Sequence, residues 1–307
     1  MAVVPLLLPD AAVNHRRIRL ALILAFAATS ALAQPHGTSQ PGQSRSELKA
    51  LGYHFDNFFQ VTSPVPETDV NALASEYRFA YRPTASPTEL FAHVNLIDYN
   101  SSGLSTSYGA RFGLNHAGKN DDFKIFVDRQ QHRPSFEVGN TFGQANQTML
   151  SAEYDHHFGD WQLGGEGQHQ AQRFPAAARR NNNYNELGLR AKYRGFGWHF
   201  TPEAGIYDGK RTVNVATETY RETGFYVQGA YIPTPNIYFS LQLFDRKRDY
   251  TNVTRVERRP GLSAVIDVRT SPRLSWLFYY SRESVRSSLR NSNFNDDLII
   301  FGPEFRF

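Results

Sequence analysis

The 307-residue sequence contains no cysteine, and apart from one segment near its N-terminus it has no long hydrophobic run. The lack of cysteine excludes a disulfide framework and a thiolate metal site. A bundle of transmembrane helices needs about 20 consecutive apolar residues for each span, which a chain with a mean hydropathy of −0.50 does not supply. The net charge of only +4, with Lys and Arg spread along the chain, gives no reason to expect a nucleic-acid partner.

Aromatic residues, by contrast, make up 14% of this polar chain, with 23 Phe and 16 Tyr. A polar average combined with many aromatics is typical of a transmembrane β-barrel, whose strands alternate apolar and polar residues between two aromatic girdles. A soluble β-sandwich shares the alternation, although its strands are usually shorter. Composition alone leaves both β architectures open.

The apolar segment near the N-terminus has the organisation of a secretory signal peptide. A basic region, His15–Arg19, precedes an apolar core, Leu20–Ala28, and Ala31–Ala33 forms a small-x-small cleavage site. The core is too short for a membrane anchor. We therefore expect residues 1–33 to direct export through the general secretory route, so that the mature chain starts at Gln34.

Two further expectations concern this N-terminal part. The residues before the basic region add nothing to the signal, so Met1 can be a start assigned too far upstream. Residues 34–47 are rich in Gln, Ser, Gly and Pro. Such a composition predicts a flexible periplasmic lead-in to the folded part of the chain.

The rest of the sequence alternates between apolar and polar residues in segments of strand length. In residues 104–114, the even positions hold Leu, Thr, Tyr, Ala, Phe and Leu, whereas the odd positions hold Ser, Ser, Gly, Arg and Gly. Clusters of Gly, Pro, Asn and Asp, such as Gly118–Asp121 and Pro233–Asn236, mark tight turns. Longer polar connections lie between them, as expected for short periplasmic turns that alternate with longer outer loops.

We therefore predict an all-β fold over residues 48–307: a closed antiparallel transmembrane β-barrel. An open sheet cannot exist in lipid because its edges would leave backbone groups unpaired. We predict fourteen strands, with twelve as the alternative, because the first strand, with Tyr53, Phe55, Phe59 and Val61 on one face, is the weakest. The predicted strand ranges are 50–61, 71–82, 88–99, 104–115, 122–133, 146–158, 161–173, 183–195, 198–209, 220–231, 237–249, 258–269, 274–286 and 294–307.

The C-terminus carries a second pattern. Ile299, Phe301, Phe305 and Phe307 alternate along the last predicted strand, and Phe307 ends the chain. This arrangement resembles the C-terminal signal of bacterial outer-membrane β-barrel proteins. The resemblance implies that the outer-membrane assembly machinery recognises this strand. Pro303 departs from the pattern, and since proline cannot donate to the ladder we expect a local irregularity there.

A shorter resemblance lies in the first predicted strand. The segment Gly52–Phe59 reads G-Y-H-F-D-N-F-F, which is similar to the opening of the β-barrel porins of exopolysaccharide loci. The resemblance covers only these few residues. It implies, as an alternative function, a barrel associated with the export of a surface polysaccharide.

The sequence offers no convincing catalytic, cofactor or metal site. Neither a Gly-x-Ser-x-Gly nor a His-Glu-x-x-His motif is present. His156 and His157 are neighbours on a predicted strand, so they point to opposite faces and cannot both bind one ion without distortion. We therefore predict a non-enzymatic protein without a cofactor, although an outer-membrane hydrolase assembled from distant strands stays an alternative.

The inward face is the candidate functional surface. Arg or Lys facing lipid at the membrane midplane costs about 2–4 kcal/mol, so charged residues in the strands should face the lumen. We expect this of Arg82, Asp155, Glu186, Arg194 and Arg282 as well as of the thirteen residues of the main set. That set is Glu76, Arg78, Arg111, Lys124, Asp128, Glu153, Glu166, Arg190, Lys192, Glu203, Arg246, Asp267 and Arg269.

Two interpretations of this charged lumen stay open. The charges can pair across strands and rigidify a closed lumen, or they can line a porin-like channel for small polar or anionic solutes, since cations slightly outnumber acids in the set. The loop 136–146 is a candidate for constricting such a channel. A structural barrel without transport is a further alternative. Outer-membrane lipid and lipopolysaccharide are the expected surroundings, and the oligomeric state is open.

Overall fold

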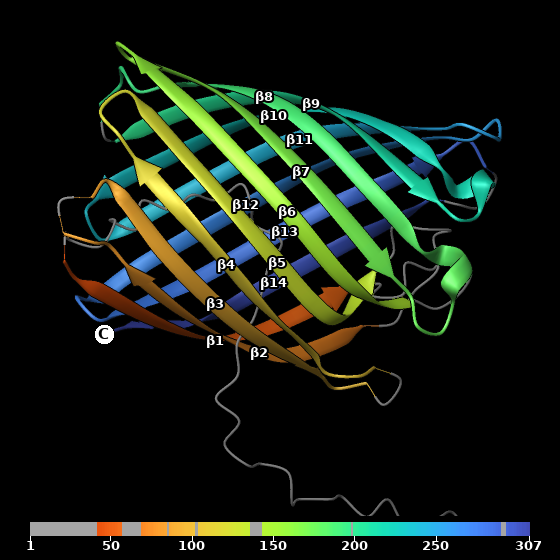
Figure 1. Cartoon of the computed structure of the whole chain (residues 1–307), viewed down its shortest axis with the longest axis horizontal. Helices are drawn as coiled ribbons and strands as arrows, with labels where there is room; N and C mark the ends of the chain where they lie inside the picture. The colour runs from red at the N-terminus through yellow and green to blue at the C-terminus, as the bar shows by residue number, and fades with distance from the viewer. Residues whose placement is uncertain are drawn as a thin grey trace, which may run out of the picture.

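The computed structural model describes residues 42–56, 69–84, 86–101, 104–135, 143–197, 199–289 and 293–307. These residues form fourteen antiparallel strands that close into one barrel, with the first strand paired to the last (Figure 1). In chain order the strands are β1 (Ser44–Asp56), β2 (Val70–Tyr81), β3 (Thr88–Tyr99), β4 (Ser107–Ala117), β5 (Asp121–Ser135), β6 (Gly143–Phe158), β7 (Trp161–Arg173), β8 (Asn182–Tyr193), β9 (Phe200–Val213), β10 (Tyr220–Thr234), β11 (Ile237–Tyr250), β12 (Val256–Ser271), β13 (Leu274–Ser287) and β14 (Phe294–Arg306).

In the part of the chain that the structure describes, helical structure is confined to two short 3-10 turns. They are η1 (Ala178–Arg180) between β7 and β8 and η2 (Ala216–Glu218) between β9 and β10. In the described ranges, neither turn nor any other segment is a helix with the length and apolar character that a membrane crossing requires. The predicted all-β closed antiparallel fold and its fourteen strands are confirmed, and the twelve-strand alternative is wrong.

The first strand differs most from its prediction. It begins at Ser44, well before the predicted start at residue 50, so residues 44–47 of the expected lead-in belong to β1. It ends at Asp56, and Phe59 and Val61 lie outside the described residues. Alternation does not mark the start of β1 because this part of the strand is polar on both faces: Ser46 faces outward and Glu47, its inward neighbour, forms ion pairs.

Both ends of the barrel sequence lie at the same end of the cylinder, which we call the terminal end. Here Ser46 and Phe307 exchange backbone hydrogen bonds of 2.9 and 3.3 Å. The hairpins at this end are tight; Gly159 and Asp160, for example, connect β6 to β7, and Gly159 adopts a φ of 58° that favours glycine. The opposite end, the far end, carries the longer connections that contain η1 and η2.

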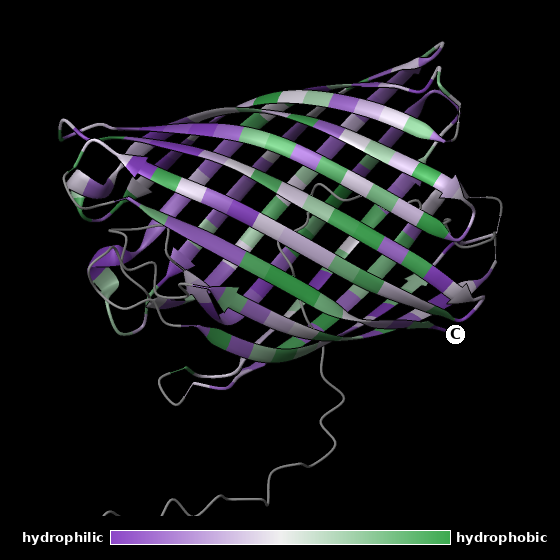
Figure 2. Cartoon of the chain, turned by 180° about the vertical axis from the view of Figure 1, so that it is seen from behind, coloured by the Kyte–Doolittle hydropathy of each residue, from purple (hydrophilic) through white to green (hydrophobic). Residues whose placement is uncertain are grey.

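The outward face carries an apolar belt with a sharp edge toward the far end. On β8, Leu187 and Leu189 are 74% and 65% exposed, and on β9 Ile206 is 62% exposed. At the next outward positions toward the far end the residues become polar, namely Asn185 and Asp208. Figure 2 shows the same change from hydrophobic to hydrophilic along other strands. Exposed apolar residues in such a belt are typical of a lipid-facing surface about 25 Å tall.

The seam between β1 and β14 is interrupted. Its ladder lacks the two pairs that Pro303 and Gly302 would form. Pro303 has no N–H to donate, and a Cβ on Gly302 would lie 2.0 Å from the carbonyl oxygen of Ala50, so the two backbones approach closely at this point. The irregularity predicted at Pro303 is confirmed.

The alternating residues of the C-terminal pattern share the outward face of β14 and the position after it. Ile299, Phe301, Phe305 and Phe307 are 37%, 51%, 37% and 73% exposed. The Phe301 ring stacks on Trp276 of β13, with ring centroids 5.5 Å apart. Their recognition by an assembly machinery stays a prediction.

Candidate pore lining

The residues that alternate with the apolar belt point into the barrel, and the thirteen predicted lumen residues lie among them. They are Glu76 and Arg78 on β2, Arg111 on β4, Lys124 and Asp128 on β5, Glu153 on β6, Glu166 on β7, Arg190 and Lys192 on β8, Glu203 on β9, Arg246 on β11, and Asp267 and Arg269 on β12.

Arg282 does not belong to this set, and its prediction was wrong. It shares a face of β13 with Trp276 and Phe278, which are exposed on the outside of the barrel. Its Nη1 lies 3.8 Å from Oδ2 of Asp297 on the neighbouring strand. A strict count of alternate positions from Trp276 would have placed Arg282 outside, because residues separated by an even number share a face.

The inward charges of β2 and β3 lie close together near the terminal end. His93 Nε2 lies 2.5 Å from Glu76 Oε1. Arg78 lies 3.6 Å from Glu89, a carboxylate that is only 1% exposed. Both predicted lumen residues of β2 are therefore neighbours of ionisable groups on the next strand.

A buried ion pair joins β4 to β5. Arg111 donates from Nε and Nη2 to Oδ2 of Asp128, at 3.1 and 2.8 Å, and Gln130 donates to the other carboxylate oxygen at 2.9 Å. The guanidinium carbon also lies 4.1 Å from the centroid of the Phe126 ring. Since Asp128 is only 1% exposed, its negative charge is stabilised by these hydrogen-bond donors and not by water.

Arg190 is the centre of an acidic wall on β6 to β8. It makes a two-pronged contact with Asp155, at 3.0 Å from Nε and 2.6 Å from Nη2. Glu153 and Glu166 lie within 3.4 Å of the same guanidinium. Charge-assisted, bidentate contacts of this kind are stronger than neutral hydrogen bonds and fix the orientation of the arginine.

A small recess opens in this wall. Carboxylates from four neighbouring strands line it, namely Glu153, Glu166, Glu186 and Glu203, together with Arg190. Lys124 and Lys192 neutralise two of them, with Nζ–oxygen distances of 3.0 Å to Glu153 and 2.9 Å to Glu203. Carboxylates outnumber cations here, so this part of the lumen is acidic.

The far end holds a denser network that the sequence prediction missed. Arg248 donates to Glu222, and both side chains are almost fully buried. Arg211 donates to Asn182 at 2.6 Å, and its guanidinium carbon lies 4.6 Å from the ring centroid of Tyr184. Arginine stacked on an aromatic face and hydrogen-bonded at its edge is held in one orientation.

The connections above this network are charged as well. In η1, burial lowers the pKa of the Arg180 guanidinium, and the charge of Glu218 opposes that shift. Arg180 also lies over the ring of Phe174, 4.7 Å from its centroid. Arg255 approaches Glu218 to 3.6 Å, which links the connection before β12 to η2.

The missed inward residues follow the same alternation as the predicted ones. Seven of them lie within the predicted strands, where alternation alone would have found them, and the other five lie just beyond the predicted strand ends. The missed residues are Arg45, Glu47, Lys49, Glu89, Arg211, Glu222, Arg248, Glu257, Arg259, Glu283, Glu304 and Arg306. Arg246, from the predicted set, lies 2.5 Å from one of them, Glu283.

These additions change the charge balance of the lumen. The predicted set of thirteen has seven cations and six acids. With Asp155, Glu186 and the twelve missed residues, the named inward charges become thirteen cations and fourteen acids. Asp267 is 9% exposed inside the barrel, whereas Arg269 is exposed near the terminal end. Most of the charges in the described part of the lumen are paired, so fixed net charge gives only weak selection by sign.

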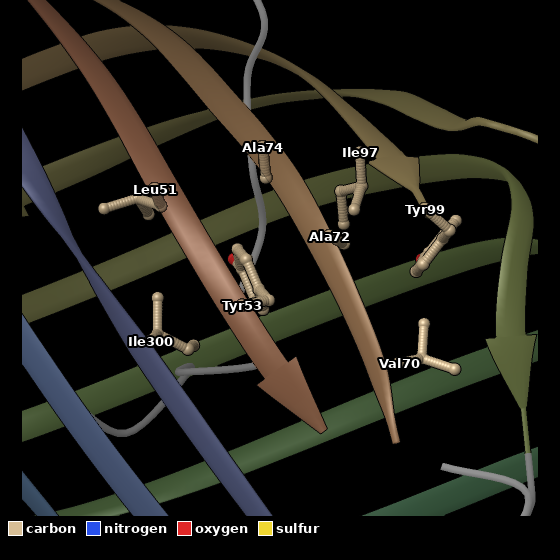
Figure 3. Packing of buried hydrophobic residues seen from close by; sticks show 8 residues of the cluster. All are labelled: Leu51, Tyr53, Val70, Ala72, Ala74, Ile97, Tyr99 and Ile300. Atoms are coloured by element: carbon tan, nitrogen blue, oxygen red, sulfur yellow. The ribbon is translucent and has the colours of Figure 1, made fainter. Parts of the chain in front are cut away.

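One side of the lumen is apolar instead. Leu51 and Tyr53 on β1, Ala74 on β2, Tyr99 on β3 and Ile300 on β14 belong to one buried cluster, which Figure 3 shows spread over four neighbouring strands. We call this cluster the apolar wall; its remaining members are Val70, Ala72 and Ile97. Tyr53 was predicted to lie on the apolar face of β1, and that apolar face points inward rather than toward lipid.

Three further predictions concern a metal site, the pair His156–His157 and the loop 136–146. In the described ranges, no group of His, Asp and Glu side chains could hold a metal ion. His156 and His157 point to opposite faces and pair with Asp121 and Asp122, at 2.8 and 2.7 Å. Of the loop 136–146, the last four residues belong to β6 and the others lie outside the described residues.

Comparison with known proteins places this architecture. No protein-family model matches the sequence. No curated protein is similar to it in sequence. The structure resembles the monoaromatic hydrocarbon channel CymD, with a TM-score of 0.51, 8% identity, and 87% of this chain and 88% of that chain covered.

It also resembles outer-membrane OmpT of Vibrio cholerae, with a TM-score of 0.50, 7% identity, and 88% of this chain and 99% of that chain covered. At such low identity the likeness concerns the fold. The chain is a closed fourteen-stranded β-barrel, and its fold is similar to the folds of these two proteins.

Proposed function

We propose that the protein is a passive, non-catalytic channel of the outer membrane for small polar or anionic solutes. The observation that carries this proposal is the pairing of an apolar outer belt with a charged inner face in one closed barrel. Barrels of about this size lie between filled eight-stranded barrels and open porins of sixteen to eighteen strands. A lumen of intermediate width suits small solutes.

The membrane placement follows from the same surfaces. The apolar belt would lie in the hydrocarbon core, and the terminal end, with its short turns, would face the periplasm. Export through residues 1–33 would deliver the chain to that side. The far end, with η1, η2 and the longer connections, would face outward.

The preference of this channel for anions should be weak. The inward cations are matched by acids, and pairs such as Arg111–Asp128 have little charge left to offer a passing ion. The acidic recess around Arg190 opposes anion entry, whereas the arginines of the far end favour it. We therefore expect size and polarity to govern passage more than the sign of the charge.

Conductance in a planar lipid bilayer tests the proposal. Folded protein should give single-channel currents in KCl, and a salt gradient should give a reversal potential of small magnitude. Heat-unfolded protein serves as the control. The absence of any current from protein that runs as a folded barrel on an unheated gel would reject the channel.

Export of a surface polysaccharide is the second candidate, and it rests on the resemblance at Gly52–Phe59. Within that segment Tyr53 faces the lumen as part of the apolar wall. Loss of surface polysaccharide from a deletion strain, restored by the intact gene, would favour this role. A normal polysaccharide layer in that strain would remove it.

A further inference from the structure

The outside of the barrel carries a cationic patch near the far end. Its members lie on the outward faces of neighbouring strands, from β9 to β13. They are Lys210, Arg221, Lys247, Arg258 and Arg286. Arg221 and Arg258 expose 65% and 67% of their side chains.

The patch brings like charges opposite one another. Lys210 faces Arg221 across β9 and β10, and Arg258 faces both Lys247 on β11 and Arg286 on β13. Like charges directly opposite in a sheet are destabilising. Three such juxtapositions on one surface therefore indicate an anionic partner that offsets the repulsion.

Acids on the same face neutralise only part of the patch. Asp208 pairs with Arg221, Asp245 with Arg258, and Asp249 with Lys247. Among the ion pairs of the described residues, none includes Lys210 or Arg286. The patch keeps a positive excess.

On the opposite side of the barrel, the outward residues at the same distance from the far end carry fewer positive charges. The outward residues next to the apolar belt there are mostly neutral or acidic, such as Asn71 on β2, Asp98 on β3, Thr148 on β6 and Asn185 on β8. Two exposed cations in this region, Arg129 on β5 and Arg173 on β7, are hydrogen-bonded locally: Arg129 lies 3.4 Å from the Thr148 hydroxyl, and Arg173 donates to the backbone carbonyl of Asn182 at 2.9 Å. The cationic patch is therefore a local feature and not a ring around the barrel.

An apolar hollow of about 1000 Å³ lies beside the patch on the outer surface. Its floor is formed where Gly165 and Gly167 of β7 lack side chains, and Leu187 and Ile206 stand at its sides. The hollow extends to Asp208 and Thr223, the first of which is already paired with an arginine of the patch.

The register of the strands places the apolar hollow and the cationic patch in one continuous row of paired outward residues. Directly paired outward residues lead from Gly167 through Leu187, Asp208 and Thr223 to Lys247, and the next residue in the row is Arg258. The row passes from the apolar belt to its polar edge because the strands are tilted against the barrel axis. An apolar hollow that opens onto exposed cations fits an amphiphile with an anionic head.

We propose that this surface binds lipopolysaccharide of the outer leaflet, with an acyl chain in the hollow and its phosphates on Arg221, Lys247 and Arg258. Guanidinium and ammonium groups at the edge of the apolar belt lie at the depth of lipid headgroups, and arginine binds phosphate in a bidentate manner. The proposal rests on the proposed outer-membrane placement and not on transport.

Titration of the folded full chain in detergent micelles with lipopolysaccharide tests the headgroup site. The variant R221Q/K247Q/R258Q should bind roughly a hundredfold more weakly, at about fivefold for each cation removed. Removal of the phosphates from the lipopolysaccharide should weaken binding to the original protein similarly. The matched control is R129Q, an exposed outward cation outside the patch, which should leave the affinity unchanged.

Several outcomes would overturn the assignment. Unchanged affinity in the triple variant, with folding verified by gel mobility before and after heating, would remove the patch as the binding site. Equal affinity for phosphatidylglycerol vesicles and lipopolysaccharide would show general attraction to anionic lipid and reject the specific ligand. Bilayer conductance of the triple variant reports on transport separately, so failure of one proposal does not imply failure of the other.

The hollow is tested by G165L. A Cβ at Gly165 would make ordinary contacts of 3.6 Å or more, so the longer side chain can fill the hollow without moving the backbone. We expect weaker binding of whole lipopolysaccharide but unchanged binding of its water-soluble, deacylated form. If G165L instead changes the oligomeric mass and leaves lipopolysaccharide affinity intact, the hollow belongs to a second copy of the chain.

Discussion

Two sides of the lumen are built on the same backbone pattern but are held together by different forces. The apolar wall, around Tyr53 and Ile300, packs aliphatic and aromatic side chains from β14, β1, β2 and β3. The charged side, from β4 to β9, is organised by ion pairs such as Arg111–Asp128 and by the contacts of Arg190. One side depends on burial, which has no preferred direction, and the other on the placement of individual donors.

The difference predicts unequal responses to mutation. Dispersion contacts are many and individually small, so trimming one apolar side chain removes only part of the packing. A buried charge that loses its partner keeps the full cost of being withdrawn from water. The charged side should therefore tolerate single changes less well than the apolar wall.

The largest effect is expected from deletion of Phe307, at the seam where the apolar wall closes. Phe307 exchanges two backbone hydrogen bonds with Ser46 and ends the exposed aromatic pattern of β14. We expect most of the protein to be lost from the outer membrane, as measured by immunoblots of membrane fractions. Phe307→Tyr keeps the aromatic ring and should retain near-normal levels; normal levels of the deletion would contradict the role of this residue in assembly.

Asp128→Ala should destabilise the folded barrel strongly. It leaves the 9% exposed Arg111 without its main partner, and breaking a buried pair costs about 3–5 kcal/mol. Urea unfolding in detergent or lipid measures this loss. The double variant R111M/D128L removes both charges and should recover most of the stability, whereas a loss equal to that of Asp128→Ala would show that the pair is not the cause.

Ile300→Val gives the matching test on the apolar wall. Ile300 is fully buried, and removing one methyl group from such a site costs about 0.5–1.5 kcal/mol. The same unfolding measurement applies, with Ile299→Val on the outward face of β14 as the control, which should cost less. A loss as large as that of Asp128→Ala would abolish the contrast between the two sides.

The smallest effect is expected on ion preference. Neutralising the recess in the variant E166Q/E186Q should shift the reversal potential toward anions, but by roughly twofold or less in permeability ratio, because charges are screened beyond about 10 Å at 0.1 M salt. The arginine variant R248Q should shift it the opposite way. Equal shifts in one direction would show that these charges do not face the conducting path.

Much of this fold follows from local sequence pattern. The alternation of residues 104–114 and the turn signal at Gly118–Asp121 each depend on neighbours in the chain, so strands and hairpins could be predicted. The inward positions of residues such as Glu153 and Arg190 follow from the same alternation. Arg282 was misplaced because its charge was given more weight than its position.

The partners of those charges could not be predicted in the same way. Arg190 meets Asp155 from two strands away, and Lys49 of β1 meets Glu304 of β14 across the whole length of the chain. Such pairings depend on register and barrel shear, which no single segment determines. For the same reason, the apolar hollow at Gly165 and the inward orientation of the apolar wall became visible only in three dimensions.

The gap at Gly302 and Pro303 has a consequence for how the barrel opens. Its first and last strands meet through the contact with the greatest separation along the chain, so that contact closes last during folding. Two pairs are missing from that ladder, so the remaining pairs form two separate hydrogen-bonded segments, one beside Phe307 and one toward Asp56. Local opening of the β1–β14 ladder that starts at this gap would let neighbouring amide protons exchange with solvent. The other strand pairs would stay closed meanwhile.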